Sequence, residues 1–385
     1  MHLNRRTSAL LSAGVISFAA VVRAEEKPTA LASALASTTI SGYVDTSAQW
    51  NIGTGNANAP NYTFGGPSKA DGFNLNVVQL SIAKPLEEGE WSSGYQVDLW
   101  FGPDANTLAS QSTGSPGDLA IRQAYVALRT PVGNGIDWKI GVFDTVLGYE
   151  VLASPNNPNF TRSWGFTIEP TTHTGVEASY KVSDALSLNA GVADTFGPMI
   201  NQRAFPPSGT KAESYKTYLG SIVLTAPDSW GWAKGSSFTA AIVNGFNSGL
   251  GDNQTSTYLG ATINTPLKGL KVGTCLDYAD FHNQPAGDPN NQWVAGVYAS
   301  YQATEKLSFH ARGEYYEQDL GGSGSESKIW GITATIQYDL WKNVLSRLEY
   351  RWDHSGSGDL FGGTTAGQPD AENSNIVMAS ITYKF

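Results

Sequence analysis

The chain has 385 residues, of which 15% are charged, 41% hydrophobic and 11% aromatic, and its formal net charge is -10. Ordinary soluble domains carry about a quarter charged residues, whereas glycine alone takes 42 positions here, a composition that favours strands and turns over long helices. Only 24 Lys and Arg stand against 34 acids, so no basic surface for nucleic acid is expected. The single cysteine, Cys275, excludes an internal disulfide and a thiolate metal cluster.

Residues 1–24 have the three-part pattern of a secretory signal peptide. Arg5 and Arg6 precede the apolar run Ala9–Val22, and small residues stand before a cleavage site after Ala24. A membrane anchor needs about 20 apolar residues, more than this run offers. We therefore predict export through a cleaved signal peptide, followed by a periplasmic N-terminal linker at residues 25–38, whose Ala-rich part is either extended or a short helix.

From Ile40 onward the residues alternate with a period of two. In Ser374–Phe385 one face is apolar and the other is polar, and in Val344–Asp353 the polar face carries Arg347, Glu349, Arg351 and Asp353. Such alternation places one face in an apolar medium and the other in a polar one. Four charges on one face fit a water-filled lumen and not the core of a soluble β-sandwich, which would bury too many polar groups.

The same alternation divides residues 39–385 into sixteen segments. It is clear in Ser41–Trp50, Trp91–Phe101, Trp138–Phe143, Val176–Lys181, Leu186–Val192, Leu259–Asn264, Leu270–Tyr278, Trp293–Gln302, Lys306–Tyr316, Lys328–Leu340, Val344–Asp353 and Ser374–Phe385, and weaker in Phe73–Lys84, Ala120–Arg129, Tyr215–Leu224 and Phe238–Asn244. Short and long connections alternate between the segments. We predict an all-β fold, a transmembrane antiparallel up-and-down β-barrel of about 16 strands with short periplasmic turns and long external loops.

Aromatic residues at the predicted strand ends support a membrane barrel, because such rings lie at the boundary between headgroups and acyl chains. They are Trp50, Trp91, Trp138, Trp293, Trp330, Tyr338, Trp341, Tyr350 and Trp352. The chain ends in Tyr383-Lys384-Phe385, which resembles the terminal aromatic signal that the barrel assembly machinery reads in bacterial outer-membrane proteins. A lipid-facing last strand explains the same residues, and the two readings are compatible.

A family resemblance covers roughly Gly42 to Phe385. Its motifs are Gly42-Tyr43-Val44-Asp45, Arg122-Gln123-Ala124-Tyr125-Val126, Gly148-Tyr149-Glu150 through Asn159, Arg162-Ser163, Pro170, His173-Thr174-Gly175-Val176 and Tyr180. These residues resemble the outer-membrane β-barrel porin family described as OmpL-like. The resemblance implies an outer-membrane channel and no catalytic residues.

The residues themselves offer little chemistry of an enzyme. The nearest nucleophile pattern, His354-Ser355-Gly356-Ser357, has glycine where a Ser on the face of the His would stand. The Gly-rich tract Gly321–Gly324 lacks the following Lys and helix of a phosphate loop. We therefore expect no enzyme activity, no bound metal and no cofactor.

The longest loop, Asp144–Gly175, is the candidate constriction. It is the third on the long-loop rim and contains Glu150, Arg162, Trp164, Glu169 and His173, with prolines that restrict its backbone. The third long loop of sixteen-stranded porins folds inward, and the resemblance implies the same here. The alternative is a flap on the surface.

Further predicted lumen residues lie on the barrel wall. They are Asp98, His310, Arg312, Glu314, Arg347, Glu349 and Arg351. Opposite charges around a constriction would set up a transverse field that polar solutes tolerate. The alternative, in which these charges neutralise one another in pairs, stays open.

These observations predict a passive diffusion channel for small hydrophilic solutes and ions in the outer membrane. Its expected partners are membrane lipid, the assembly machinery, the solutes and, as an open question, two further copies in a homotrimer. One alternative is a substrate-selective channel, such as one for carbohydrates, with Tyr43, Trp100, Tyr298 and Tyr316 as a stacking track. Another is a plugged barrel with a structural or adhesive role.

Overall fold

The structure is a computed structural model that describes residues 16–17, 37–53, 55–60, 66–108, 111–112, 117–203, 214–247, 250–281, 289–320 and 325–385. The predicted signal peptide, apart from residues 16–17, and residues 25–36 of the predicted linker lie outside the described residues. Residues 16–17 form the short strand β1 (Ile16–Ser17), which pairs with β2.

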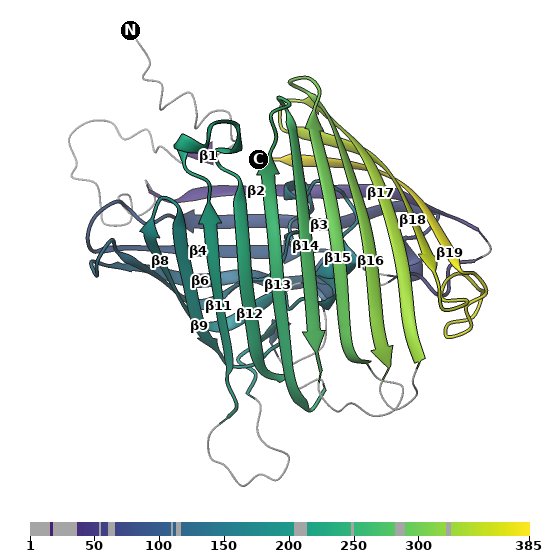
Figure 1. The fold of residues 1–385 in the computed structure, drawn as a ribbon, viewed down its shortest axis with the longest axis horizontal. Coiled ribbons are helices and arrows are strands. Elements are labelled where there is room, and N and C mark those ends of the chain that lie inside the picture. Colours follow the sequence, from purple (N-terminus) through teal and green to yellow (C-terminus); the bar gives the residue numbers. More distant parts are fainter. Residues whose placement is uncertain are drawn as a thin grey trace.

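Sixteen antiparallel strands form a closed barrel (Figure 1). They are β2 (Thr39–Ile52), β3 (Gly72–Lys84), β4 (Ser92–Phe101), β6 (Leu119–Thr130), β7 (Ile136–Asp144), β8 (Thr172–Ser183), β9 (Leu186–Ala193), β11 (Thr217–Thr225), β12 (Ser237–Asn247), β13 (Asp252–Asn264), β14 (Leu270–Asp280), β15 (Pro289–Gln302), β16 (Leu307–Leu320), β17 (Ser325–Trp341), β18 (Val344–Ser355) and β19 (Asn373–Lys384). Each pairs with its neighbour in the barrel, and β19 pairs with β2 to close the ring. The predicted barrel of about 16 strands is confirmed, and each of the sixteen predicted segments corresponds to one strand.

The two faces of each strand meet different surroundings. In β18, Leu348 and Tyr350 point outward and are 53% and 45% exposed, whereas Arg351, the next residue, is buried inside the barrel. Trp50, Trp91 and Trp341 are exposed on the outer face near strand ends, as expected of aromatic girdles. Among the described residues, no helix is long and apolar enough to cross a membrane. The outward apolar band is the surface that faces lipid.

The connections differ at the two rims. On one rim, turns such as 184–185 and 342–343 have two residues, although 226–236 contains the 3-10 helix η3 (Asp228–Ala233). On the other rim, loop 145–171 contains η2 (Ser154–Asn156) and α4 (Trp164–Ile168), and loop 102–118 contains α3 (Pro103–Thr107) and β5 (Gln111–Ser112), which pairs with β10 (Met199–Ile200). Helix η1 (Gly66–Lys69) precedes β3. The longest connections thus lie on this second rim, as predicted.

The chain end is attached to the first barrel strand. The backbone N–H of Phe385 donates to Gly42 O and the N–H of Gly42 donates to Phe385 O, both at 3.0 Å. A Cβ atom at Gly42 would lie 2.7 Å from Cζ of Phe385, so the ring covers the outward side of this glycine. Lys384 points inward, and its Nζ donates to Pro155 O of loop 145–171 at 3.2 Å.

We expect Phe385→Asp to lower the yield of membrane-inserted barrel far more than Lys384→Ala. A charge on the lipid-facing side is costly in proportion to its depth, and Phe385→Asp also removes the terminal aromatic ring, whereas Lys384→Ala removes one inward hydrogen bond. The measurement is the fraction of protein that migrates as folded barrel in unboiled gel samples of outer membranes. Equal yields for the two variants would contradict this face assignment and the role of Phe385 in assembly.

Candidate constriction site

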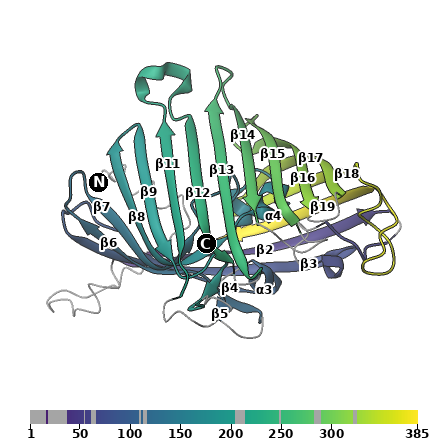
Figure 2. The same ribbon diagram turned by 60° about the horizontal axis from the view of Figure 1, so that its bottom comes forward.

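Loop 145–171 enters the barrel between β7 and β8. Its helix α4 begins where Ser163 caps the first turn, since Ser163 Oγ accepts a hydrogen bond from the N–H of Phe166 at 3.0 Å. Figure 2 shows α4 within the ring of strands, and it contacts β14, β15 and β16. The loop thus leaves the rim and packs against the inner face of the opposite wall.

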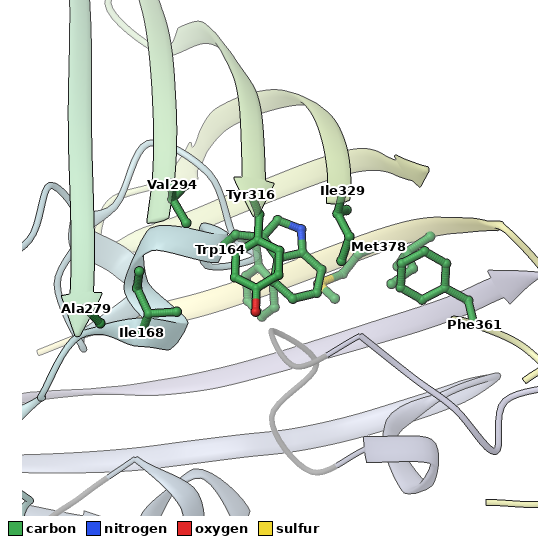
Figure 3. Close-up of a cluster of buried hydrophobic side chains, with 10 residues drawn as sticks. Trp164, Ile168, Ala279, Val294, Tyr316, Ile329, Phe361 and Met378 are labelled. Atoms are coloured by element: carbon green, nitrogen blue, oxygen red, sulfur yellow. The ribbon is translucent and has the colours of Figure 1, made fainter. Parts of the chain in front are cut away.

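Trp164 is the apolar anchor of this loop. Its ring stacks on Tyr316 of β16 with 5.1 Å between ring centroids, and its Nε1 donates to Asp353 Oδ1 at 2.7 Å. Figure 3 shows Trp164 in the middle of a buried cluster drawn from the loop and the wall. The cluster consists of Phe160, Trp164, Ile168, Ala279, Val294, Tyr316, Ile329, Phe361, Ile376 and Met378. Replacing a buried Trp by Ala typically lowers the free energy of unfolding by about 3 to 5 kcal/mol. Burial of Trp164 therefore contributes strongly to holding the loop in place.

Acids of the wall accept hydrogen bonds from the loop backbone. Glu349 of β18 accepts from the N–H groups of Phe160 and Thr161 at 2.6 and 2.9 Å, and Glu314 of β16 accepts from the N–H of Trp164 at 2.6 Å. An irregular loop buried in a barrel would otherwise leave these donors unpaired. The carboxylates therefore allow this backbone to be buried.

Arginines of the wall donate to the loop carbonyls. Arg312 Nη1 donates to Thr161 O at 2.7 Å, and Arg351 Nη1 donates to Arg162 O at 2.5 Å. Arg347 donates to two carbonyls in the preceding part of the loop, Ser154 O at 3.0 Å and Asn157 O at 2.6 Å. The acidic side chains of the wall thus bind backbone N–H groups of the loop, and the basic side chains bind its backbone carbonyl groups.

The same charges pair with one another. Arg312 lies 2.7 Å from Glu150 of the loop and 2.6 Å from Glu314, and Arg351 lies 2.9 Å from Asp353. The side chains of Arg312 and Arg351 have no exposed surface. These contacts are ion pairs of the kind that the second alternative describes, and the loop covers Arg312 and Arg351.

The remaining loop residues differ in their contacts. Arg162 donates to the carbonyl groups of Phe160 and Leu152 and so stiffens the loop itself. Glu169 lies beside Asp277 of β14, and burial together with that neighbouring acid raises the pKa of Glu169 well above its ordinary value. Burial and the repulsion between two neighbouring carboxylates both favour the neutral form of Glu169.

We expected His173 in the long loop, but it lies in strand β8, which begins at Thr172. Its register partner is Phe143 of β7, and its Nε2 lies 3.1 Å from Thr145 Oγ1. Two predicted wall residues lie in other networks. Asp98 pairs with Arg122 at 2.6 Å, and His310 Nδ1 lies 2.8 Å from Ser300 Oγ.

The aromatic residues considered for a carbohydrate track are buried and separated. Tyr43 and Trp100 belong to one apolar cluster, Tyr298 to a second and Tyr316 to a third. Loop residues cover two of them, since Tyr149 stacks on Tyr298 with 3.9 Å between ring centroids and Trp164 stacks on Tyr316. These four rings therefore do not form an exposed stacking path. The sequence alternation indicates which face of the strand a residue occupies, but it does not indicate which other residues cover that face.

A second inward segment, helix α3, was not expected from the sequence. Its Ala105 is fully buried in a cluster with Trp100 and with Leu152 and Phe166 of loop 145–171. Lys69 of η1 pairs with Asp104 of α3 at 2.5 Å and holds it from the side. The signal was present in Gly102-Pro103, because proline favours the first turn of a helix.

Comparisons with known proteins agree with this geometry. The family described as "Putative beta-barrel porin-2, OmpL-like" matches residues 37–385. Among curated proteins, no sequence matches the chain.

Several solved structures have a similar fold. The outer membrane channel DcaP of Acinetobacter baumannii is 16% identical with a TM-score of 0.59, and the match covers 90% of this chain and 97% of that one. An anion-selective porin from Comamonas acidovorans is 16% identical with a TM-score of 0.60, covering 91% and 99%. Salmonella typhi OmpF, in complex with daunomycin, is 15% identical with a TM-score of 0.59, covering 90% and 97%. At this identity the likeness establishes the shared fold.

Proposed function

Because the chain belongs to the OmpL-like family of β-barrel porins, we propose that it is an outer-membrane channel for the passive diffusion of small hydrophilic solutes and ions. The observation that carries this function is a closed barrel, apolar outside and polar inside, with loop 145–171 held in its interior. A barrel of sixteen strands is wide enough to enclose an aqueous path. Permeation then requires no chemical step, and we infer no enzyme activity.

Loop 145–171 is the constriction in this proposal. Its contacts with β16 and β18 hold it across the interior, and solutes pass through the space that it leaves open. The width of this space determines which solutes can pass. Arg312 and Arg351 act as structural anchors for the loop, so the charge preference comes from side chains nearer water, such as Lys139, whose side chain is 35% exposed beside Glu177.

Export and assembly are part of the same proposal. We infer that residues 1–24 direct export and are removed, and that the assembly machinery recognises Tyr383 and Phe385. A homotrimer is the oligomer that we favour. OmpT of Vibrio cholerae, 12% identical with a TM-score of 0.56 over 90% of this chain and 99% of that one, has a solved structure described as the trimer form.

The test combines fractionation with transport. We expect the protein in outer membranes, with faster gel migration before boiling than after, because a closed barrel has no edge from which to unravel. In planar bilayers it should give stepwise conductance, and in liposome swelling the uptake of neutral sugars should fall with their size without saturation. A heat-modifiable barrel that conducts no ions would instead favour the plugged, structural alternative. Saturable uptake of one sugar would favour a selective channel.

A further inference from the structure

A groove of about 530 Å³ lies on the outer face of the barrel across β15 to β19. Its floor is formed by Ala299, Ala311 and Ala334, which are register partners on three neighbouring strands. Phe309, Ile336 and Tyr350 rise around these small side chains. The strands β15 to β18 lie side by side in Figure 1. The groove is therefore a hollow in the surface that faces lipid.

The chemistry of the groove is apolar. The intervening residues His310, Thr335 and Glu349 point into the barrel, where Glu349 holds the loop backbone, so the outward side chains that form the hollow are aliphatic or aromatic. An unfilled hollow would lose the dispersion contacts that its walls could make. Its volume lies within the range of small-molecule sites, roughly 300 to 1,000 Å³. A hydrocarbon chain fits these requirements.

The ammonium group of Lys306 lies beyond one end of the groove, on the side of the short-turn rim. Tyr338 lies two residues beyond Ile336 on the same outward face, and Nζ of Lys306 lies 6.0 Å from the centroid of its ring. Tyr338 lies four positions after Ala334, or about 13 Å along the strand. Lys306 belongs to a turn on the short-turn rim, which faces the periplasm in barrels of this type.

The position of Lys306 matches the headgroup level of a membrane. Exposed aromatic residues such as Trp341, 69% exposed on the same rim, mark the boundary between acyl chains and headgroups. Glu305 and Lys306 both border the polar pocket at the barrel mouth, but the contact with Tyr338 holds the ammonium on the outer side. An anionic phosphate at this level would meet a positive charge.

We propose that the groove binds a phospholipid of the periplasmic leaflet, with one acyl chain over Ala311 and Ala334 and the phosphate beside Lys306. This site is separate from the permeation path, because the groove lies on the opposite side of the wall from loop 145–171.

Native mass spectrometry of the detergent-solubilised barrel tests this proposal, with dioleoyl phosphatidylglycerol as the probe. The double variant Ala311→Leu/Ala334→Leu fills the floor, and we expect it to lose the bound-lipid peak. Lys306→Gln should weaken binding about five-fold, the usual contribution of one lysine near an anionic membrane surface. The matched controls are Ala261→Leu, an outward alanine of β13, and Lys268→Gln, an exposed lysine of another turn on the same rim.

All variants should remain heat-modifiable and keep their conductance, which separates this test from that of the channel function. Equal lipid binding by wild type and the double variant would overturn the proposal. So would loss of lipid from the control variants as well, because binding would then be unspecific. A double variant that changes the oligomeric mass and leaves lipid binding intact would assign the groove to a second copy of the chain instead.

Discussion

Deletion of residues 155–169 is expected to raise single-channel conductance roughly two- to three-fold, because current scales with the narrowest cross-section of the path. The deletion removes Trp164 and the backbone groups that Glu349 and Arg351 bind. Their charged side chains would then face water, so the ion preference should change as well. Larger sugars should enter liposomes that carry the deleted barrel. Planar-bilayer recordings and swelling rates provide both measurements.

A matched control shortens a connection outside the barrel. Helix η3 lies in turn 226–236 on the opposite rim, has no buried residue and exposes Trp230 and Trp232. Replacing residues 227–234 by Gly-Ser should leave conductance unchanged. If the 155–169 deletion also leaves conductance unchanged while the barrel stays heat-modifiable, the loop is not the narrowest point of the path and the constriction proposal is wrong.

The strands could be predicted from sequence because a barrel repeats one physical rule along its length. In β18, the outward residue Leu348 is apolar and the inward residue Glu349 is charged, so the polarity of each side chain alone indicates its face. Even the weak segment Phe238–Asn244 corresponds to β12, since the neighbouring strands fix its register. Arg312 and Arg351, which the alternation assigned to the inner face, both donate to backbone carbonyl groups of loop 145–171.

The loop could not be derived in this way. Its inward course came from a family resemblance, and its partners are mostly backbone groups, such as the N–H groups of Phe160 and Thr161 that Glu349 binds. Every residue carries these groups, so no sequence pattern marks them. The placement of His173 was wrong for a related reason. Pairing with Phe143 extends β8 to a position that its own alternation does not reveal.

The pair formed by Glu150 and Arg312 should be strongly coupled energetically. Arg312→Leu leaves Glu150 without its ion-pair partner in a buried site, and breaking one side of such a pair costs about 3 to 5 kcal/mol. We expect a lower free energy of unfolding in urea, measured in lipid vesicles, and a larger, noisier conductance as the loop loosens. Glu150→Leu should act in the same direction, because it leaves Arg312 with Glu314 alone as its ion-pair partner.

The double variant Glu150→Leu/Arg312→Leu should recover much of the stability lost in either single variant, because apolar residues can replace a buried pair at little cost. Glu314 keeps Arg351 as a partner at 3.5 Å in that variant, so the loss of Arg312 does not leave Glu314 without an ion pair. The exposed pair Lys181 and Asp184 is the control, and its double-mutant cycle should show almost no coupling. Additive losses at Glu150 and Arg312 would mean that their ion pair does not hold the loop, and the anchoring would then rest on Trp164 and the hydrogen bonds of Glu349.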